Sequence, residues 1–157
     1  PLCCAEVAAY HAATYPSRAA EYGPGLAGLL DIGLATSGVE YARAHDVRQA
    51  LRGEFAHVFQ GVDVAISPAL ARQNLTLEDF AVFGTRDDDW PNLLRFTAPF
   101  DITGTPTLSL PAGRNNDGAP FGFQLVAGHL EESLLLRAGH AWQRATAHHQ
   151  LRPRLAP

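Results

Sequence analysis

Two short apolar runs joined by a turn constrain the fold of this chain more than any other feature. The segments "PTLSLPAG" (106–113) and "PFGFQLVAG" (120–128) are typical of strands, and "RNNDG" between them is rich in residues that tolerate positive φ. A third run, "VDVAIS" (62–67), predicts a buried strand that Pro68 ends. Three short strands cannot close a barrel, and "FQLVAG" needs cover on both faces. The sequence therefore predicts an α/β fold, with a partial sheet covered by helices.

Helices are expected on both sides of these strands. Their patterns place them at 3–14, 26–35, 38–60, 92–99 (ending at or just before Pro99) and 131–147. The stretch 72–90 is polar and acidic, and "RDDDW" (86–90) within it is predicted to be a solvated loop without a function. The clearest signal is "SGVE", a capping box in which Ser37 and Glu40 exchange hydrogen bonds. After this cap, five apolar residues share one helical face and predict packing on another element: Val47, Leu51, Phe55, Val58 and Phe59.

Composition excludes several classes of function. The net charge is −4 and the arginines are scattered, so no basic stripe favours nucleic-acid binding. The uninterrupted apolar runs are short, and no secretory signal is visible, which predicts a cytoplasmic protein without a membrane partner. Cys3 and Cys4 are adjacent, too close for an unstrained disulfide, and are expected to be reduced thiols. Basic residues that are all arginine, together with high alanine content, suggest a GC-rich bacterial gene.

The residues of this chain do not form a recognisable catalytic set. The chain has no lysine, which excludes a lysine base or Schiff base within it. None of its five serines lies in a G-x-S-x-G motif or beside a second serine. His45 and His57 point roughly 120° apart on a predicted helix. No H-x-x-x-H or C-x-x-C pattern occurs, so a metal site is disfavoured.

The segments "FTAPFDITGTPTLSLPAG", "GAPFGFQLVAG" and "EESLLL" resemble the C-terminal part of the amidase signature family. Upstream, "AEVAAYHA", "SGVEYARAHDVRQALRGEF" and "VDVAISPAL" continue the resemblance in the family's order, so that it covers nearly the whole chain. The resemblance implies a large mixed sheet wrapped by helices, of which residues 1–157 would be the C-terminal portion of a single domain.

The resemblance also implies a chemistry. Members hydrolyse or transfer carboxamides with a Ser–Ser–Lys triad that lies in their N-terminal half, and they need no cofactor or metal. Because this chain has neither a lysine nor a Ser-Ser dipeptide, no catalytic residue can be assigned within it. Its expected partners are a small-molecule amide substrate and an N-terminal amidase segment, missing here or present as a second chain.

The resemblance implies that this chain forms one wall of a substrate pocket. Six residues are substrate-binding candidates: Thr97, Phe100, Asp101 and Thr103 around the F-T-x-P motif, and Ser67 with Pro68 at a neighbouring strand end. Relatives that take ammonia from glutamine for tRNA-linked amidation are expected to have an acid shortly before this motif. Leu93 and Leu94 stand there instead and favour a general amidase with a less polar pocket.

Two hypotheses remain open from the sequence. In the first, the chain is the C-terminal portion of an amidase whose triad lies on a missing segment or partner chain. In the second, it is a truncated, non-catalytic remnant that serves as an interaction or structural module through exposed sheet edges. A metal hydrolase is a third reading, disfavoured by the histidine spacing.

Overall fold

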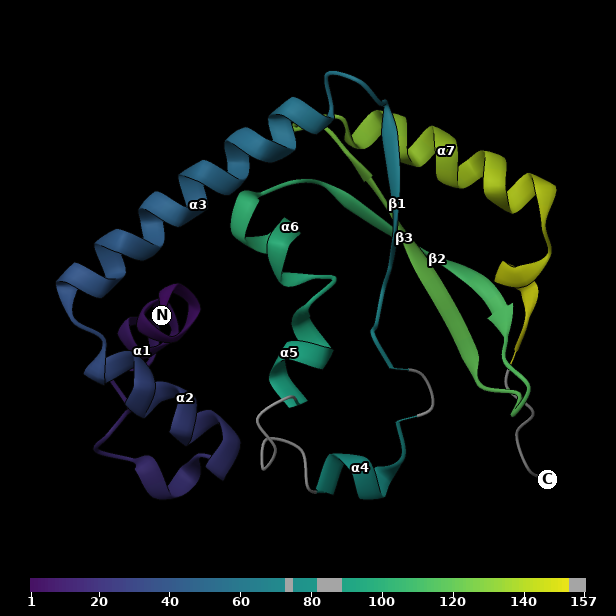
Figure 1. Cartoon of the computed structure of the whole chain (residues 1–157). Coiled ribbons are helices and arrows are strands. Elements are labelled where there is room, and N and C mark those ends of the chain that lie inside the picture. Colours follow the sequence, from purple (N-terminus) through teal and green to yellow (C-terminus); the bar gives the residue numbers. More distant parts are fainter. Residues whose placement is uncertain (73–74, 82–88, 153–157) are drawn as a thin grey trace. The chain divides into compact units, whose positions relative to one another are not determined.

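The computed structural model describes residues 1–72, 75–81 and 89–152, and only the backbone of Trp90. The chain divides into two compact units, Pro1–Leu51 and Arg52–Pro157 (Figure 1). None of the helices in the described ranges is both long and apolar enough to cross a membrane.

The first unit is built on a close pair of helices. Helix α1 spans Leu2–His11 and α2 spans Pro24–Ala35, with the short 3₁₀ helix η1 (Ala19–Glu21) between them, which confirms the two helices predicted there. A Cβ added to Gly33 would lie 2.1 Å from the carbonyl oxygen of Cys4. The two helices can therefore approach this closely only because residue 33 has no side chain.

A tyrosine connects the core of this unit to α2. Tyr15 is buried with Ala8 and Leu30, and its hydroxyl donates to the carboxylate of Asp31 over 2.6 Å. Hydrogen bonding to the Asp31 carboxylate, together with burial, raises the pKa of Tyr15 above its ordinary value. The phenol thus stays neutral and its hydrogen bond is kept across the physiological pH range.

Helix α3 (Gly38–Val58) begins at the predicted capping box. The backbone N–H of Ser37 donates to Glu40 over 2.8 Å, and the N–H of Glu40 donates back to the Ser37 hydroxyl over 3.2 Å. The prediction of one covered apolar face is correct only in part. Leu51, Phe55 and Phe59 are half-buried, whereas Val47 and Val58 are exposed. At about 100° per residue the two valines lie at one edge of the apolar stripe, and only the rest of the stripe is covered.

The capping box gives α3 a testable dependence on pH. Donation from the backbone and hydroxyl of Ser37 lowers the pKa of Glu40 below its ordinary value of 4.5. The stabilisation is therefore present above that value and is lost as the pH falls through the lowered pKa. Urea unfolding should show wild type more stable than Glu40→Ala at pH 7, with a gap that shrinks below about pH 4. The control Glu54→Ala, on an exposed position of the same helix, should show no comparable shrinking; an equal trend in both would contradict the capping role.

The second unit contains the sheet. Strands β1 (Val64–Pro68), β2 (Thr107–Arg114) and β3 (Pro120–Ala127) pair antiparallel in the order β1-β3-β2. The turn between β2 and β3 forms because the Asn115 side chain accepts hydrogen bonds from the backbone N–H groups of Asp117 and Ala119. The predicted hairpin, the third strand and the α/β class are confirmed.

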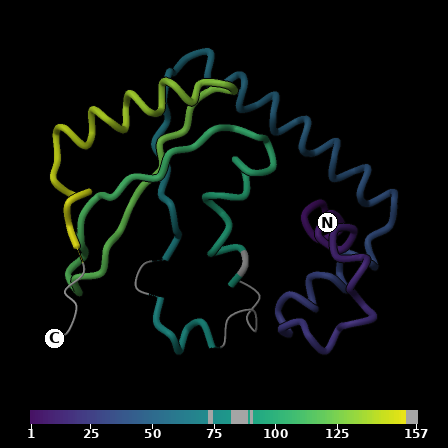
Figure 2. Tube along the Cα trace, turned by 180° about the vertical axis from the view of Figure 1, so that it is seen from behind, coloured from purple at the N-terminus to yellow at the C-terminus, as the bar shows by residue number. Residues whose placement is uncertain are grey.

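Helix α7 (Glu132–Ala145) covers one face of this sheet (Figure 2). Leu135 of α7 is buried against a row of apolar strand residues, and Trp142 donates from Nε1 to the carbonyl of Pro111 over 3.0 Å. The strand residues of this core are Leu110, Leu125 and Ala127. The predicted C-terminal amphipathic helix is thus confirmed.

Two predictions between the strands are wrong. The predicted loop "RDDDW" (86–90) lies partly outside the described residues, which omit 82–88, and its last two residues begin helix α5 (Asp89–Leu94) instead. Helix α4 (Leu77–Ala81) lies earlier in the same polar stretch. Helix α4 forms because Thr76 and Asp79 make a second reciprocal cap, with N–H to side-chain bonds of 2.9 and 3.1 Å. Hydrogen bonds from the backbone and hydroxyl of Thr76, with help from Arg72, lower the pKa of Asp79.

The expected single helix 92–99 is also wrong, because the segment contains two short helices. Helix α5 ends at Leu94, and α6 (Ala98–Thr103) begins after a turn. Pro99 opens α6 instead of ending a helix. A proline fits the first turn of a helix, because the N–H it lacks would have no partner there.

Candidate functional site

A buried glutamine joins the two segments that hold most of the candidate residues. Gln124 lies in the middle of β3 and its side chain is only 3% exposed. Its Nε2 donates to the carbonyl of Pro68 over 2.8 Å and to the carbonyl of Phe96 over 2.8 Å. Both partners are acceptors, so these bonds fix which end of the amide is nitrogen. The end of β1 and the turn before α6 are therefore held at one place, the Gln124 junction.

The antiparallel register explains why Gln124 and Ser67 share a face. Gln124 pairs with Ser67 on one side and with Ser109 on the other, so the three polar side chains form a row across the sheet. Leu125 lies on the opposite face, packed beneath α7. The hydroxyl of Ser67 donates to the carbonyl of its neighbour Pro68 over 3.1 Å. Ser67 is thus held in place locally, and among the described residues no hydrogen bond links it to a basic side chain that could activate it as a nucleophile.

Thr97 follows the carbonyl that Gln124 binds. It is half-buried and occupies the residue before α6, yet its hydroxyl makes no capping bond to that helix. Its side chain instead donates weakly to the carbonyl of Leu94 over 3.4 Å. The structure therefore brings three of the six candidates, Ser67, Pro68 and Thr97, to the Gln124 junction.

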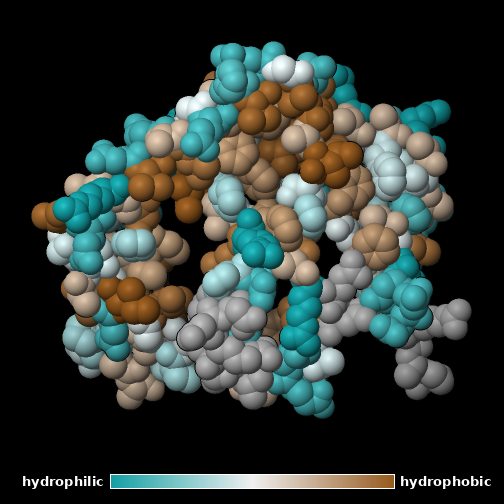
Figure 3. Space-filling view, viewed as in Figure 1, coloured by the Kyte–Doolittle hydropathy of each residue, from teal (hydrophilic) through white to brown (hydrophobic). Residues whose placement is uncertain are grey.

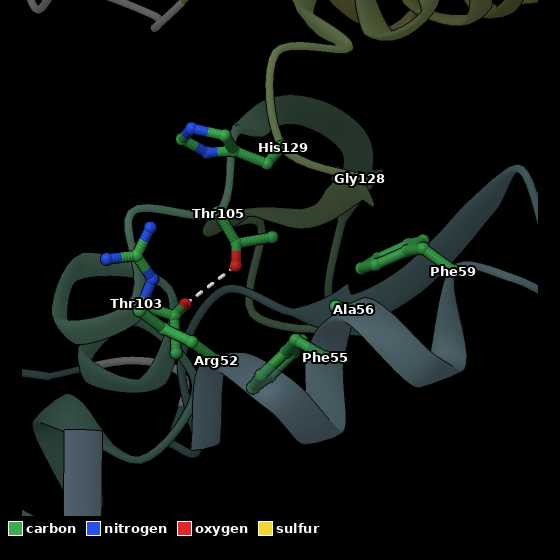
Figure 4. Close-up of a pocket in the computed structure, with 8 residues that line it drawn as sticks. All are labelled: Arg52, Phe55, Ala56, Phe59, Thr103, Thr105, Gly128 and His129. Atoms are coloured by element: carbon green, nitrogen blue, oxygen red, sulfur yellow. Dashed lines mark hydrogen bonds between the residues drawn. The ribbon is translucent and has the colours of Figure 1, made fainter. Parts of the chain in front are cut away.

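The other three candidates lie elsewhere on α6. Phe100 packs edge-on against Phe55, with ring centroids 5.6 Å apart, and Asp101 is exposed to solvent. Thr103 is 4% exposed, and its hydroxyl is hydrogen-bonded to the carbonyl of Pro99 at 2.8 Å and to the Thr105 hydroxyl at 2.6 Å. Thr103 also borders a small cavity at the end of α3 rather than the Gln124 junction (Figure 4).

Gln124 is not among the candidates that the sequence selects. It appears in the motif "GFQLV", where alternation places it opposite Leu125, but alternation does not show what a polar residue on that face binds. Its two acceptors lie 28 and 56 residues away in sequence. The sequence does carry one signal for Gln124, which is a polar residue within an otherwise apolar strand. Such an amide is expected to be buried and must then find hydrogen-bond partners. In the described residues no group of three histidine, cysteine or acidic side chains is placed to hold a metal ion.

Comparison with known proteins identifies the family of this chain. The family model for Amidase matches residues 12–136. The chain belongs to the amidase family. It is 38% identical over 148 residues to the putative amidase AmiD of Mycobacterium tuberculosis, covering 94% of this chain and 31% of AmiD. It is 32% identical over 159 residues to an amidase of Pseudomonas putida, covering 96% of this chain and 33% of that enzyme.

Solved structures share the same fold. A crystal structure of an amidase superposes with a TM-score of 0.69 at 27% identity and covers 90% of this chain but 33% of that enzyme. This amidase chain therefore spans about a third of the length of the relatives it matches.

Proposed function

We propose that this chain forms the C-terminal portion of an amidohydrolase that cleaves carboxamides, with the nucleophile and base supplied by sequence outside residues 1–157. The observation that supports this most is the family match over residues 12–136, together with a chain that has no lysine and no paired serines. In the proposed reaction an activated serine attacks the amide carbon, and backbone N–H groups stabilise the oxyanion. The amine or ammonia then leaves, and water hydrolyses the acyl-enzyme.

Within that reaction this chain would supply a wall of the substrate pocket. Ser67, Pro68 and Thr97 are the candidates that the geometry favours, because Gln124 holds their two segments together. Phe100, Asp101 and Thr103 remain proposed substrate-binding residues from the resemblance, although Phe100 and Thr103 already have packing and hydrogen-bonding partners.

The substrate we propose is an amide with a weakly polar body. Leu93 is half-buried and Leu94 is exposed at the end of α5, and Arg95 separates them from the Phe96–Thr97 turn. Neither side chain can form an ion pair with the ammonium group of a free amino acid. This favours a general amidase over an enzyme that draws ammonia from glutamine.

The second candidate function is an interaction or structural module without catalysis. One observation favours it: β1 is an edge strand of the described sheet, and its Ile66 is 74% exposed. Figure 3 shows apolar surface over the sheet and the end of α3, where Val58 and Val62 are also exposed. An open apolar edge of this kind can pair with another chain.

Native mass spectrometry of the protein purified from its own cells would separate the two functions. A complex in which this chain is bound to a second, lysine-containing chain, or a longer product that includes it, supports the amidase. A species at the chain's own mass of 16.9 kDa, alone or bound only to unrelated proteins, supports the module.

A further inference from the structure

A cavity of about 170 Å³ lies beside the end of α3, away from the Gln124 junction. It adjoins Gly128, the residue after β3 and four residues beyond Gln124, a separation of about 13 Å at ~3.3 Å per residue. The residues that define its chemistry come from α3 and the residue after it, from the end of α6 and the α6–β2 link, and from the turn after β3: Arg52, Phe55, Phe59, Thr103, Thr105 and His129.

The polar side of this cavity is cationic. Figure 4 shows the guanidinium of Arg52 and the imidazole of His129 on the same side of the Thr103–Thr105 hydroxyl pair. The ion pairs among the described residues are Arg18–Glu21 and Arg72–Asp79, so Arg52 has no carboxylate partner there. No acidic residue is among the described residues that line the cavity. A permanently charged group without a counter-ion, in a recess without acids, favours an anion.

The hydroxyl protons of Thr103 and Thr105 are already donated to other groups, so neither is free for a bound anion. Thr103 donates to the carbonyl of Pro99 over 2.8 Å, which leaves Thr105 to donate to Thr103 over 2.6 Å. The Nδ1 of His129 lies 3.3 Å from the carbonyl of Gly104, which can only accept, so Nδ1 bears the proton. Among the described side chains at this cavity, Arg52 is therefore a donor that has neither a hydrogen-bond nor an ion-pair partner.

The other side of the cavity is aromatic. Figure 4 shows the rings of Phe55 and Phe59 on the side away from the guanidinium of Arg52. Phe59 also lies close to the turn after β3, because a Cβ placed on Gly128 would lie 3.5 Å from the Phe59 Cβ. Leu130, just after His129, has φ of 65°, a conformation that leucine seldom adopts and that often marks a functional site.

We propose that this cavity binds a small carboxylate with an aromatic or other apolar body. The carboxylate would form two parallel hydrogen bonds with the Arg52 guanidinium, and the apolar body would rest on Phe55 and Phe59. This site is separate from the Gln124 junction and does not depend on the proposed amidase function.

The test is a titration of the 157-residue chain with benzoate, followed by ¹H–¹⁵N spectra, with benzyl alcohol as the uncharged ligand. Benzoate should bind saturably and shift the amide signals of Thr105, Gly128 and His129. Benzyl alcohol should bind at least about tenfold more weakly, since it cannot make the paired bonds to Arg52. Equal binding of the two ligands would overturn the assignment of an anion site, and unchanged spectra with benzoate would overturn the site itself.

Substitutions of Arg52 test whether its guanidinium binds the carboxylate of benzoate. Arg52→Gln should weaken benzoate binding at least about tenfold, and Arg52→Lys a few-fold, because lysine keeps the charge and loses the planar fork. The matched control is Arg144→Gln, which makes the same change of charge at an exposed position of α7 and should leave the dissociation constant unchanged. The spectra of all three variants must stay dispersed, showing a folded chain. An unchanged constant in Arg52→Gln would contradict the proposal.

Discussion

Replacing Gln124 by methionine should destabilise the second unit by about 1–3 kcal/mol, because the half-buried carbonyl of Phe96 loses its donor. The exposed carbonyl of Pro68, by contrast, keeps the Ser67 hydroxyl as a donor. Methionine is chosen because it is unbranched and close to glutamine in size, so the change removes the amide and leaves little cavity. The carbonyls of Pro68 and Phe96 would both lose a donor at 2.8 Å. Urea unfolding measured by tryptophan fluorescence would give the change in free energy.

The matched control for this prediction is Gln143→Met, the same substitution at an exposed position of α7. Surface changes of this kind stay within about 0.5 kcal/mol of wild type. If the two variants unfold at the same urea concentration, the Gln124 junction does not hold β1 to the Phe96–Thr97 turn.

Replacing Gly33 by alanine should cost the first unit about 3 kcal/mol, the upper end of the usual cost of overpacking. The new Cβ would lie 2.1 Å from the Cys4 carbonyl oxygen and 2.7 Å from the Ala8 Cβ. Backbone atoms cannot move aside as a flexible side chain can, so α1 and α2 must separate. Hydrogen exchange should then become faster in both helices.

Gly28→Ala is the control for this second change, because it lies in the same helix and a Cβ there meets nothing within 4 Å. Alanine in an open helical position should stabilise the helix by about 0.5–1 kcal/mol. The free energy of unfolding is therefore expected to fall in Gly33→Ala and to rise in Gly28→Ala. Similar protection of α1 in both variants would show that the contact at Gly33 does not limit the approach of the helices.

Local signals in the sequence are sufficient to predict much of this fold. The Asn-rich turn between β2 and β3, the Ser37–Glu40 cap and the apolar stripe of α7 each depend on neighbours within a few residues. The same reasoning can find α4, because Thr76 and Asp79 have the spacing of a cap, but the acidic surroundings favour a loop. Pro99 is ambiguous in the same way, because a proline that can follow the end of a helix fits the first turn equally well.

The candidate site could be predicted only in part, because its geometry depends on contacts between distant segments. The resemblance selects Ser67, Pro68 and Thr97, but the hydrogen bonds that bring them together come from Gln124, on another strand. Likewise, Arg52 and His129 lie far apart in sequence, and only the folded unit places them at one cavity. Periodicity identifies the face on which a side chain lies, not the partner it reaches across the fold.

An amide-hydrolysis assay tests most directly whether this chain is the non-catalytic portion of an amidase. It compares two purified proteins: the 157-residue chain, and the product of the longest reading frame that includes it. We expect release of ammonia or amine from simple aryl and alkyl amides only with the longer, lysine-containing product. Hydrolysis by the 157-residue chain alone, or none by the longer product over the same amides, would contradict the proposed function.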